Sequence, residues 1–401
     1  MMFRPATRIS SLPAPATIAV ATRARELAAE GKPVLSLALG QPDFPSPAEA
    51  LAGAIGEVEE GRTGYPPIVG QKDLLEAIAY KFKRDNGLEA KLSQLMVSNG
   101  GKQVIFNAFM ASLEEGDEVI VPSPYWVSYP LIARMFGGVP VDVVCREEDG
   151  FRPDAAHIAQ AITPKTRWLV LNFPNNPTGA ILERKDLEAI AEVLRAAPHV
   201  LIMCDEMYEH LTFDGRKHLS LAQVAPDLAD RILIVNGVSK AYAMTGWRVG
   251  FAYGPEALIR AMVKVQGNIT SGICTLAQGG AKAALYGSMD GIEVMRATYE
   301  RRRNKVVESL RAIPGMTCAM PEGAFYAYPG IKSLIGKRSA AGYALENDVA
   351  FAEALLEEEH LAVVPGSAFG LGPHVRLSFA ASDEQLMEAC TRLKRFVQGI
   401  R

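Results

Sequence analysis

The feature that most constrains the fold is a repeated alternation of short apolar segments with amphipathic stretches. Helical patterns begin near residues 101, 128, 153 and 183. Apolar segments flank them at residues 96–98, 118–121, 139–143, 168–171, 200–204 and 232–235. Strands this apolar, alternating with helices, are typical of a mainly parallel sheet covered on both faces. We therefore expect an α/β fold in which ligands bind beyond the carboxyl ends of the strands.

The length of the chain and a change of pattern near residue 290 predict two domains. The 401 residues, 49% hydrophobic and 22% charged, are too many for one core. After a long charged helical stretch at 291–310, short strands and helices follow in a smaller α+β arrangement. We expect an N-terminal arm with part of the small domain (1–46), a large domain (47–290) and a small C-terminal domain (291–401).

The N-terminal segment allows two interpretations. Residues 1–25 contain Arg4, Arg8, Arg23 and Arg25 but no acidic residue, a composition shared with organelle transit peptides. Residues 17–30 nevertheless have helical periodicity, with Thr17 as the candidate cap. We prefer an arm followed by a helix.

Composition argues against several classes of function. The net charge is -3 and the basic residues are scattered, so neither a nucleic-acid surface nor an acidic membrane partner is indicated. No apolar run is long enough to span a bilayer. The six histidines lack metal-ligand spacing, and we expect no metal. The five cysteines are far apart and form no CxxC pair, which favours buried thiols in the reduced cytoplasm.

The stretch GVSKAYAMTGWRVG at residues 237–250 carries the most informative charges. Lys240 and Arg248 are its only charged residues, and it follows the apolar segment 232–235. A lysine sheltered at a strand end loses hydration, which lowers its pKa and lets it form a Schiff base with a carbonyl. Arg248 keeps its charge and suits an oxyanion such as phosphate. The alternative is a lysine that extends to solvent from an ordinary loop.

Three other motifs fall at predicted strand ends. SNGGKQ at 98–103 passes from strand to helix, where backbone N–H groups can hold a phosphate, although a plain left-handed turn also explains it. NFPNNPTG at 172–179 forms a rigid turn that holds an amide toward the sheet edge. Asp205 ends the run 200–204, where a carboxylate needs a cationic partner such as a protonated aromatic nitrogen, unless it caps a helix. Tyr208, three residues after Asp205, would point in the same direction as Asp205 if a short turn or helix begins there.

Together these motifs resemble a known family. NPTG (176–179), DEMY (205–208), SK (239–240), GWR (246–248) and RLSF (376–379), in this order and at these separations, resemble class I/II aminotransferases of pyridoxal-phosphate (PLP) fold type I. The resemblance extends from about residue 17 to the C-terminus. GGKQ (100–103), PYWVSY (124–129) and AMTGW (243–247) are most similar to bacterial aspartate aminotransferases of the prokaryotic subgroup.

The resemblance implies PLP as cofactor, bound by the large domain, and assigns roles around its ring. Lys240 would hold the cofactor covalently and later move a proton between the substrate α-carbon and the cofactor. Asp205 would pair with the ring nitrogen. Asn176 and Tyr208 would hydrogen-bond the phenolate oxygen, and Trp126 would stack on the ring.

Other roles implied by the resemblance concern the phosphate and the substrate. The phosphate would lie near Gly101, Lys102 and Arg248. Arg376 would bind the substrate α-carboxylate through a bidentate fork, with the backbone of Gly40 close by. The substrate would also meet Lys102, Trp126, Asn176 and, from the arm, Thr17. Tyr65 would reach the phosphate of a neighbouring subunit, which implies a homodimer with shared active sites.

We expect the enzyme to move the amino group of aspartate, and of glutamate, to 2-oxoglutarate by a ping-pong mechanism, with aromatic amino acids as further substrates. The alternative is an aromatic or an aspartate/prephenate aminotransferase. A carbon–sulfur lyase or decarboxylase on the same fold, and a regulator that binds ligand without chemistry, are less favoured.

Two details bear on substrate choice. The resemblance implies that Lys102, in GGKQ, meets the distal carboxylate of a dicarboxylic substrate, although it could instead face the phosphate or solvent. In the arm, LPAPAT at 12–17 replaces the subgroup's lysine and serine with Pro13 and Pro15. Losing a cation and a hydroxyl predicts broader specificity, with aromatic substrates accepted near Trp126 and Tyr129, and argues against prephenate transfer.

Overall fold

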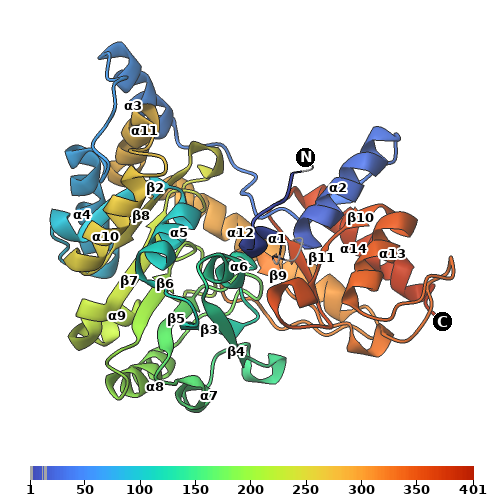
Figure 1. Ribbon diagram of the computed structural model, residues 1–401. Helices are drawn as coiled ribbons and strands as arrows, with labels where there is room; N and C mark the ends of the chain where they lie inside the picture. Colours follow the sequence, from blue (N-terminus) through green and yellow to red (C-terminus); the bar gives the residue numbers. More distant parts are fainter. Residues whose placement is uncertain (1–2, 11, 13–15) are drawn as a thin grey trace.

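A seven-stranded sheet forms the centre of the protein (Figure 1). The computed structural model describes residues 3–10, 12 and 16–401, with residues 16–19 described by their backbone alone. Across the sheet the strands are β2 (Leu95–Asn99), β8 (Val249–Tyr253), β7 (Ile232–Gly237), β6 (Leu201–Asp205), β5 (Thr166–Asn172), β3 (Glu118–Ser123) and β4 (Val139–Val144). All neighbours pair in parallel except β8, which is antiparallel to β2 and β7. The predicted mainly parallel sheet is confirmed.

The antiparallel strand β8 was not predicted from the sequence. Its first two residues belong to the lysine-containing stretch at 237–250, and no helical pattern separates it from the apolar segment 232–235 to mark a further strand. Because β8 runs against β7, with Gly237 paired to Gly250, its first residues lie at the edge where β7 ends. Asn99, the last residue of β2, pairs with Val249 at the same edge. The connection between β7 and β8 therefore begins and ends at the carboxyl edge of the sheet.

Helices cover both faces of the sheet (Figure 1). One face packs against α5 (Gly101–Ser112), α6 (Ser128–Met135) and α10 (Glu256–Gly267). The other packs against α3 (Ala48–Glu59), α4 (Lys72–Asn86), α7 (Ala155–Ala161), α8 (Arg184–Arg195), α9 (Leu221–Val224) and α11 (Thr275–Tyr286). The strand period of two explains how one segment serves both cores: on β5, Leu169 and Leu171 join one core, while Trp168 and Val170 join the other.

A second group of elements lies beside the sheet and has its own core (Figure 1). It contains α12 (Asp290–Arg311), β9 (Tyr326–Ala327), α13 (Asp348–Glu359), β10 (Leu361–Ala362), β11 (Val364–Pro365), β12 (Val375–Ser378) and α14 (Asp383–Gln398). Strands β11, β12 and β9 form a small antiparallel sheet, and β1 (Leu35–Ser36) pairs with β10. Tyr208 and Phe213, from the chain after β6, also join this core. The division of the chain at residues 46 and 290 stays a prediction.

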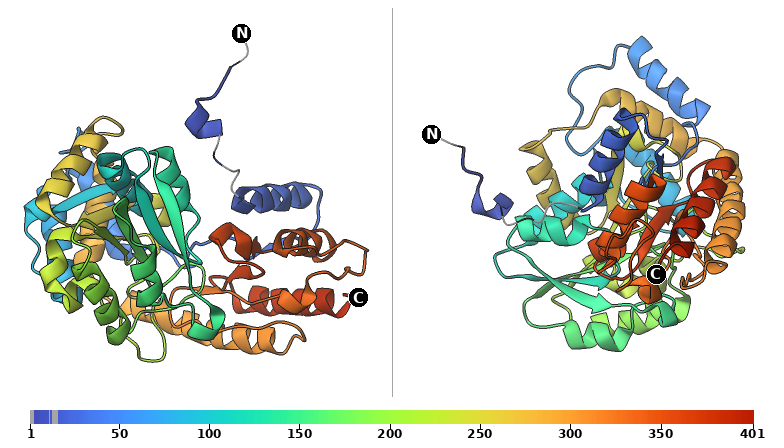
Figure 2. Two further views of the ribbon diagram at one scale, coloured as in Figure 1. Left: turned by 60° about the horizontal axis from the view of Figure 1, so that its bottom comes forward. Right: turned by 90° about the vertical axis from the view of Figure 1, so that its right-hand side faces the viewer.

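The N-terminal region contains the expected helix, with one correction. Helix α2 (Ala16–Ala29) matches the predicted helix at 17–30, but it begins before Thr17, so Thr17 is not its cap. The side chain of Thr17 lies outside the described residues. A short helix, α1 (Thr7–Ser10), precedes it and projects from the body of the protein (Figure 2). In the described part of the chain, every helix is too short or too polar to cross a bilayer.

Candidate active site

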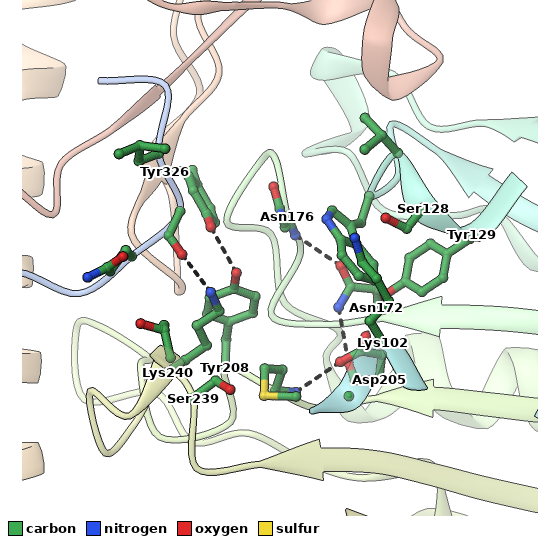
Figure 3. A pocket seen from close by; sticks show the side chains of 18 of the residues that line it. Lys102, Ser128, Tyr129, Asn172, Asn176, Asp205, Tyr208, Ser239, Lys240 and Tyr326 are labelled. Carbon is green, nitrogen blue, oxygen red and sulfur yellow. Dashed lines mark hydrogen bonds between the residues drawn. The ribbon is translucent and has the colours of Figure 1, made fainter. Parts of the chain in front are cut away.

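A cavity of about 440 Å³ opens at the carboxyl edge of the sheet. Residues from strand ends and from the small sheet line it together (Figure 3). Among the predicted site residues, those that line it are Gly40, Gly101, Lys102, Trp126, Asn176, Asp205, Tyr208, Lys240, Arg248 and Arg376. Tyr65 does not line it and is 99% exposed. The side chain of Thr17 is not described.

Lys240 follows β7 and extends its amine into the cavity (Figure 3). Its Nζ donates a hydrogen bond to the carbonyl oxygen of Gly40 at 2.5 Å. Burial, together with the charges of Arg376 and Arg248, lowers the pKa of Lys240 to about 8, against the opposite effect of Asp205. A solvent-directed lysine in an ordinary loop does not fit this placement. The amine is half neutral at a pH near 8, well below the pH at which an ordinary lysine becomes free to attack a carbonyl.

Asp205 is the last residue of β6 and is buried. Its Oδ2 accepts a hydrogen bond from the hydroxyl of Tyr129 at 2.6 Å, and its Oδ1 accepts one from the N–H of Met207 at 3.2 Å. Burial raises the pKa of Asp205 to about 6, although both hydrogen bonds act to lower it. The bond to Met207 caps a turn, because no helix follows β6 directly. A buried carboxylate in this setting is suited to a cationic nitrogen in the cavity.

The N-terminus of α5 and the side chain of Arg248 form an anion site. Arg248 donates to the carbonyl oxygens of Thr245 at 2.9 Å and Asn99 at 3.3 Å. Gly100 precedes α5 with φ +83°, and a Cβ there would lie 2.3 Å from Nη2 of Arg248. The ψ of Gly100 is 163°, so the plain left-handed turn expected as an alternative is not formed. The absence of a side chain at Gly100 lets the arginine approach the start of the helix. The free N–H groups there and the guanidinium fit a phosphate.

Lys102 and Trp126 lie together on the cavity wall. The Nζ of Lys102 is 5.0 Å from the centre of the Trp126 ring, within range of a cation–π contact. Desolvation and the charge of Arg248 lower the pKa of Lys102. Lys102 therefore presents a cation at the wall of the cavity.

Arg376, on β12, is buried with one edge of its guanidinium unpartnered. Nη1 donates to Oδ1 of Asn176 at 3.0 Å, and Nη2 donates to the carbonyl oxygen of Ala38 at 2.6 Å. The buried Nε has no hydrogen-bond acceptor. An unsatisfied buried donor is costly, and because Arg376 lines the cavity, its incompletely paired guanidinium is suited to an incoming carboxylate.

Sequence reasoning missed the roles of several lining residues: Asn172, Tyr129, Tyr326 and Phe369. Asn172 could have been found, since it directly follows the predicted strand 168–171 and is the first residue of NFPNNPTG. Its Oδ1 accepts from the N–H of Asn176 at 3.1 Å, and its Nδ2 donates to the carbonyl of Asp205 at 3.2 Å. Tyr129 was expected only as part of an apolar wall. Tyr326 lies far along the chain, and no local pattern connects it with the site.

One cluster outside the cavity has the spacing of a metal site. Oxygen and nitrogen atoms of Asp85, Glu209 and His210 lie within 4.8 Å of one another. Cations of the protein already occupy this position: Lys81 forms an ion pair with Glu209, and Arg84 Nε lies 2.6 Å from Asp85. The cluster is a buried ion-pair network between α4 and the turn after β6.

Comparisons with known proteins agree with this geometry. The sequence profile of the family described as aminotransferase class I and II matches residues 32–393. A probable aspartate/prephenate aminotransferase of Rhizobium leguminosarum bv. phaseoli is 49% identical over 391 residues, 98% of each chain. The aspartate/prephenate aminotransferase of Cereibacter sphaeroides is 49% identical over 96% of each chain.

Solved structures show the same fold. The aspartate aminotransferase from Rhizobium meliloti is 44% identical and aligns over 100% of both chains with a TM-score of 0.97. That from Thermus thermophilus with maleate is 41% identical, with a TM-score of 0.91 over 98% of this chain and 100% of the other.

The low pKa of Lys240 generates a first prediction. In the cofactor-free protein, acetylation of Lys240 should rise with pH around a midpoint near 8, because only the neutral amine reacts. An ordinary lysine would give a midpoint of about 10.4. Brief labelling with acetic anhydride at a series of pH values, followed by peptide mass spectrometry, measures it. Arg376→Gln should move the midpoint upward by removing a nearby positive charge; an unchanged midpoint would contradict the stated cause.

Proposed function

This chain belongs to the aminotransferase class I and II family, and we propose that aspartate is its main amino donor and 2-oxoglutarate its acceptor. Its membership of the family makes it a PLP-dependent enzyme that moves amino groups between amino acids and 2-oxo acids. The observation that carries the proposal is one cavity with two separate cations for carboxylates, Arg376 and Lys102. A substrate with two carboxylates can satisfy both. The names of similar proteins, aspartate aminotransferases among them, support the same choice.

The residues of the cavity fit PLP in charge and chemistry. Asp205 offers a buried carboxylate for the ring nitrogen, Arg248 and the start of α5 suit the phosphate, and Lys240 offers an amine for the aldehyde carbon. Trp126 offers an aromatic face, and Tyr208 with Asn176 a polar edge for the ring oxygen. When bound, PLP supplies an electron sink for the charge left on the substrate α-carbon after its proton is removed.

The chain itself provides orientation and proton transfer. Arg376 binds the α-carboxylate through its guanidinium, which lines the cavity, and so fixes the position of the α-carbon. The neutral amine of Lys240 would then accept the proton of the substrate α-carbon, and its ammonium form would give a proton to the cofactor. A pKa near 8 gives both forms access at neutral pH. Asp205, as a carboxylate, keeps the ring nitrogen protonated.

The role of Lys240 generates a second prediction. Lys240→Ala should abolish both turnover and covalent attachment of the cofactor, because the amine assigned to attack the aldehyde carbon is removed. Borohydride reduction of the loaded enzyme, followed by peptide mapping, locates the attachment. Lys102→Ala is the matched control: it removes another lysine of the same cavity and should leave the label on Lys240. A label found on any other lysine would show that the assignment is wrong.

A homodimer with shared active sites is part of the proposal. Tyr65 is 99% exposed and lies in the loop after α3, away from its own cavity. On α3, Leu51, Ile55 and Val58 are exposed at helical spacing, so they form one apolar face. We expect a second copy to cover this face, with Tyr65 reaching the phosphate site of the partner.

The dimer proposal generates a third prediction. Tyr65→Ala damages the partner's site, whereas Lys240→Ala damages its own, so a mixed dimer keeps one intact site. Mixing the two inactive variants under conditions of subunit exchange should restore about a quarter of wild-type activity. Differently tagged subunits and pull-down verify the exchange. No recovery despite verified exchange would argue against shared sites.

The domain division and the cellular location are proposals of the same kind. The separate cores around the large sheet and around α12–α14 support an arm with part of the small domain at 1–46, a large domain at 47–290 and a small domain at 291–401.

Five free cysteines, all but Cys274 buried, support a reduced cytoplasmic location. Cell fractionation with an antibody to the protein tests the location.

A second candidate function is aspartate/prephenate transfer, which the names of two similar proteins favour. The sequence argues against it through Pro13 and Pro15, which lie outside the described residues. Measuring kcat/KM for prephenate beside 2-oxoglutarate, with aspartate as donor, decides between them.

Substrate choice generates a fourth prediction. Lys102→Ala should lower kcat/KM for aspartate at least about tenfold more than for phenylalanine, because only aspartate loses a charged hydrogen bond at its distal carboxylate. Both values are measured at saturating cofactor, since Lys102 also lies near Arg248. Lys72→Ala, an exposed lysine of α4, serves as the control. An equal loss for both substrates would show that Lys102 does not bind the distal carboxylate.

A further inference from the structure

We propose that Tyr326 is a positioning residue that joins the carboxylate clamp of Arg376 to the hydroxyl of Tyr208, so that the two halves of the site are held in one geometry. The proposal rests on the function assigned to Arg376 and Tyr208 above. Tyr326 lies on β9, which pairs with β12 beside Arg376, and it is 1% exposed (Figure 3).

The ring of Tyr326 fixes the plane of the guanidinium. The Cζ atom of Arg376 lies 4.6 Å from the centre of the Tyr326 ring and 4.8 Å from that of Phe369. Both distances are within the range of cation–π contacts. Two of the nitrogens are already bound to Asn176 and Ala38. Two rings and two hydrogen bonds restrict the rotation of the guanidinium, so it keeps one orientation toward the cavity.

The hydroxyl of Tyr326 reaches the other half of the site. It lies 2.9 Å from the hydroxyl of Tyr208, which follows β6. Burial raises the pKa of both tyrosines, so both remain protonated. Two phenols joined by one O–H···O bond use only one of their two protons. If Tyr326 donates, the proton of Tyr208 stays available for an acceptor in the cavity, and the incoming hydrogen bond strengthens Tyr208 as a donor.

The hydroxyl of Tyr326 also lies against the backbone of Gly40. A Cβ on Gly40 would be 2.3 Å from the Tyr326 hydroxyl oxygen, so glycine is needed there. The carbonyl of this Gly40 accepts the hydrogen bond from Lys240. Tyr326 therefore contacts the carboxylate-binding group, the phenol that faces the cofactor ring and the segment that receives the lysine.

The hydroxyl is tested by Tyr326→Phe, which keeps the ring. Without the hydrogen bond donated by Tyr326, Tyr208 should stabilise the anionic ring oxygen of the cofactor less. The proton that lies beside this oxygen should then be held more tightly, because the oxygen keeps more of its negative charge. The pH midpoint of the absorption change of the loaded enzyme should therefore rise by about half a pH unit. Tyr328→Phe is the matched control: Tyr328 is also buried, and its hydroxyl binds the carbonyls of Gly366 and Leu371 instead. Its midpoint should not move.

The ring is tested by Tyr326→Leu. The dissociation constant for maleate, measured by calorimetry, and KM for aspartate should both rise about tenfold, with a smaller change in kcat. Phe213→Leu is the control, because Phe213 packs on another buried arginine, Arg303, at 4.9 Å outside the cavity. It should lower the melting temperature comparably and leave maleate binding unchanged.

Either result can overturn the proposal. A midpoint in Tyr326→Phe equal to that in Tyr328→Phe, or maleate binding in Tyr326→Leu equal to that in Phe213→Leu, shows a merely structural tyrosine. If Tyr326→Leu does not fold, as its melting curve would show, the midpoint alone decides. Failure of the proposed function is seen separately, as a wild-type enzyme that does not transaminate aspartate or does not carry cofactor on Lys240.

Discussion

The burial of ionisable groups at one edge of the sheet is the constraint on which the site depends. Asp205 and Arg376 are buried and Lys240 is largely so. Removing an isolated charge from water costs several kcal/mol or more. The protein reduces this cost with neutral partners, the hydroxyl of Tyr129 and the carbonyls of Ala38 and Gly40, rather than with full counter-charges. The charges remain incompletely compensated: a phosphate and carboxylates would compensate the cations, and a protonated ring nitrogen would compensate Asp205.

Strand direction makes this concentration of charge possible. β5, β6 and β7 all end at one edge, so the residues that follow them, Asn176, Asp205 and Lys240, meet without any being close in sequence. The small antiparallel sheet supplies Arg376 and Tyr326 from the other side of the cavity. The cavity thus lies between two separately cored parts, each of which supplies groups that the other lacks.

Features set by local pattern could be predicted from the sequence, and features set by packing could not. The apolar strands and the ends at which Asp205 and Lys240 lie follow from the alternation of patterns. The antiparallel direction of β8 has no local signal. The contact of Tyr129 with Asp205 depends on how α6 packs, and that of Tyr326 with Tyr208 joins residues 118 apart in sequence. The predicted role of Tyr65 needs a second chain, and the division at residues 46 and 290 stays a prediction.

The antiparallel strand β8 has a consequence for how the sequence can change with time. Connections between parallel strands return to the opposite edge through a helix, where added residues can bulge into solvent. The segment between β7 and β8 has no such outlet, since Gly237 and Gly250 pair directly and both its ends adjoin the cavity. An insertion there would displace Lys240 relative to Arg248. We therefore expect insertions and deletions among related sequences to occur elsewhere. This segment should keep its length even where its amino acids differ.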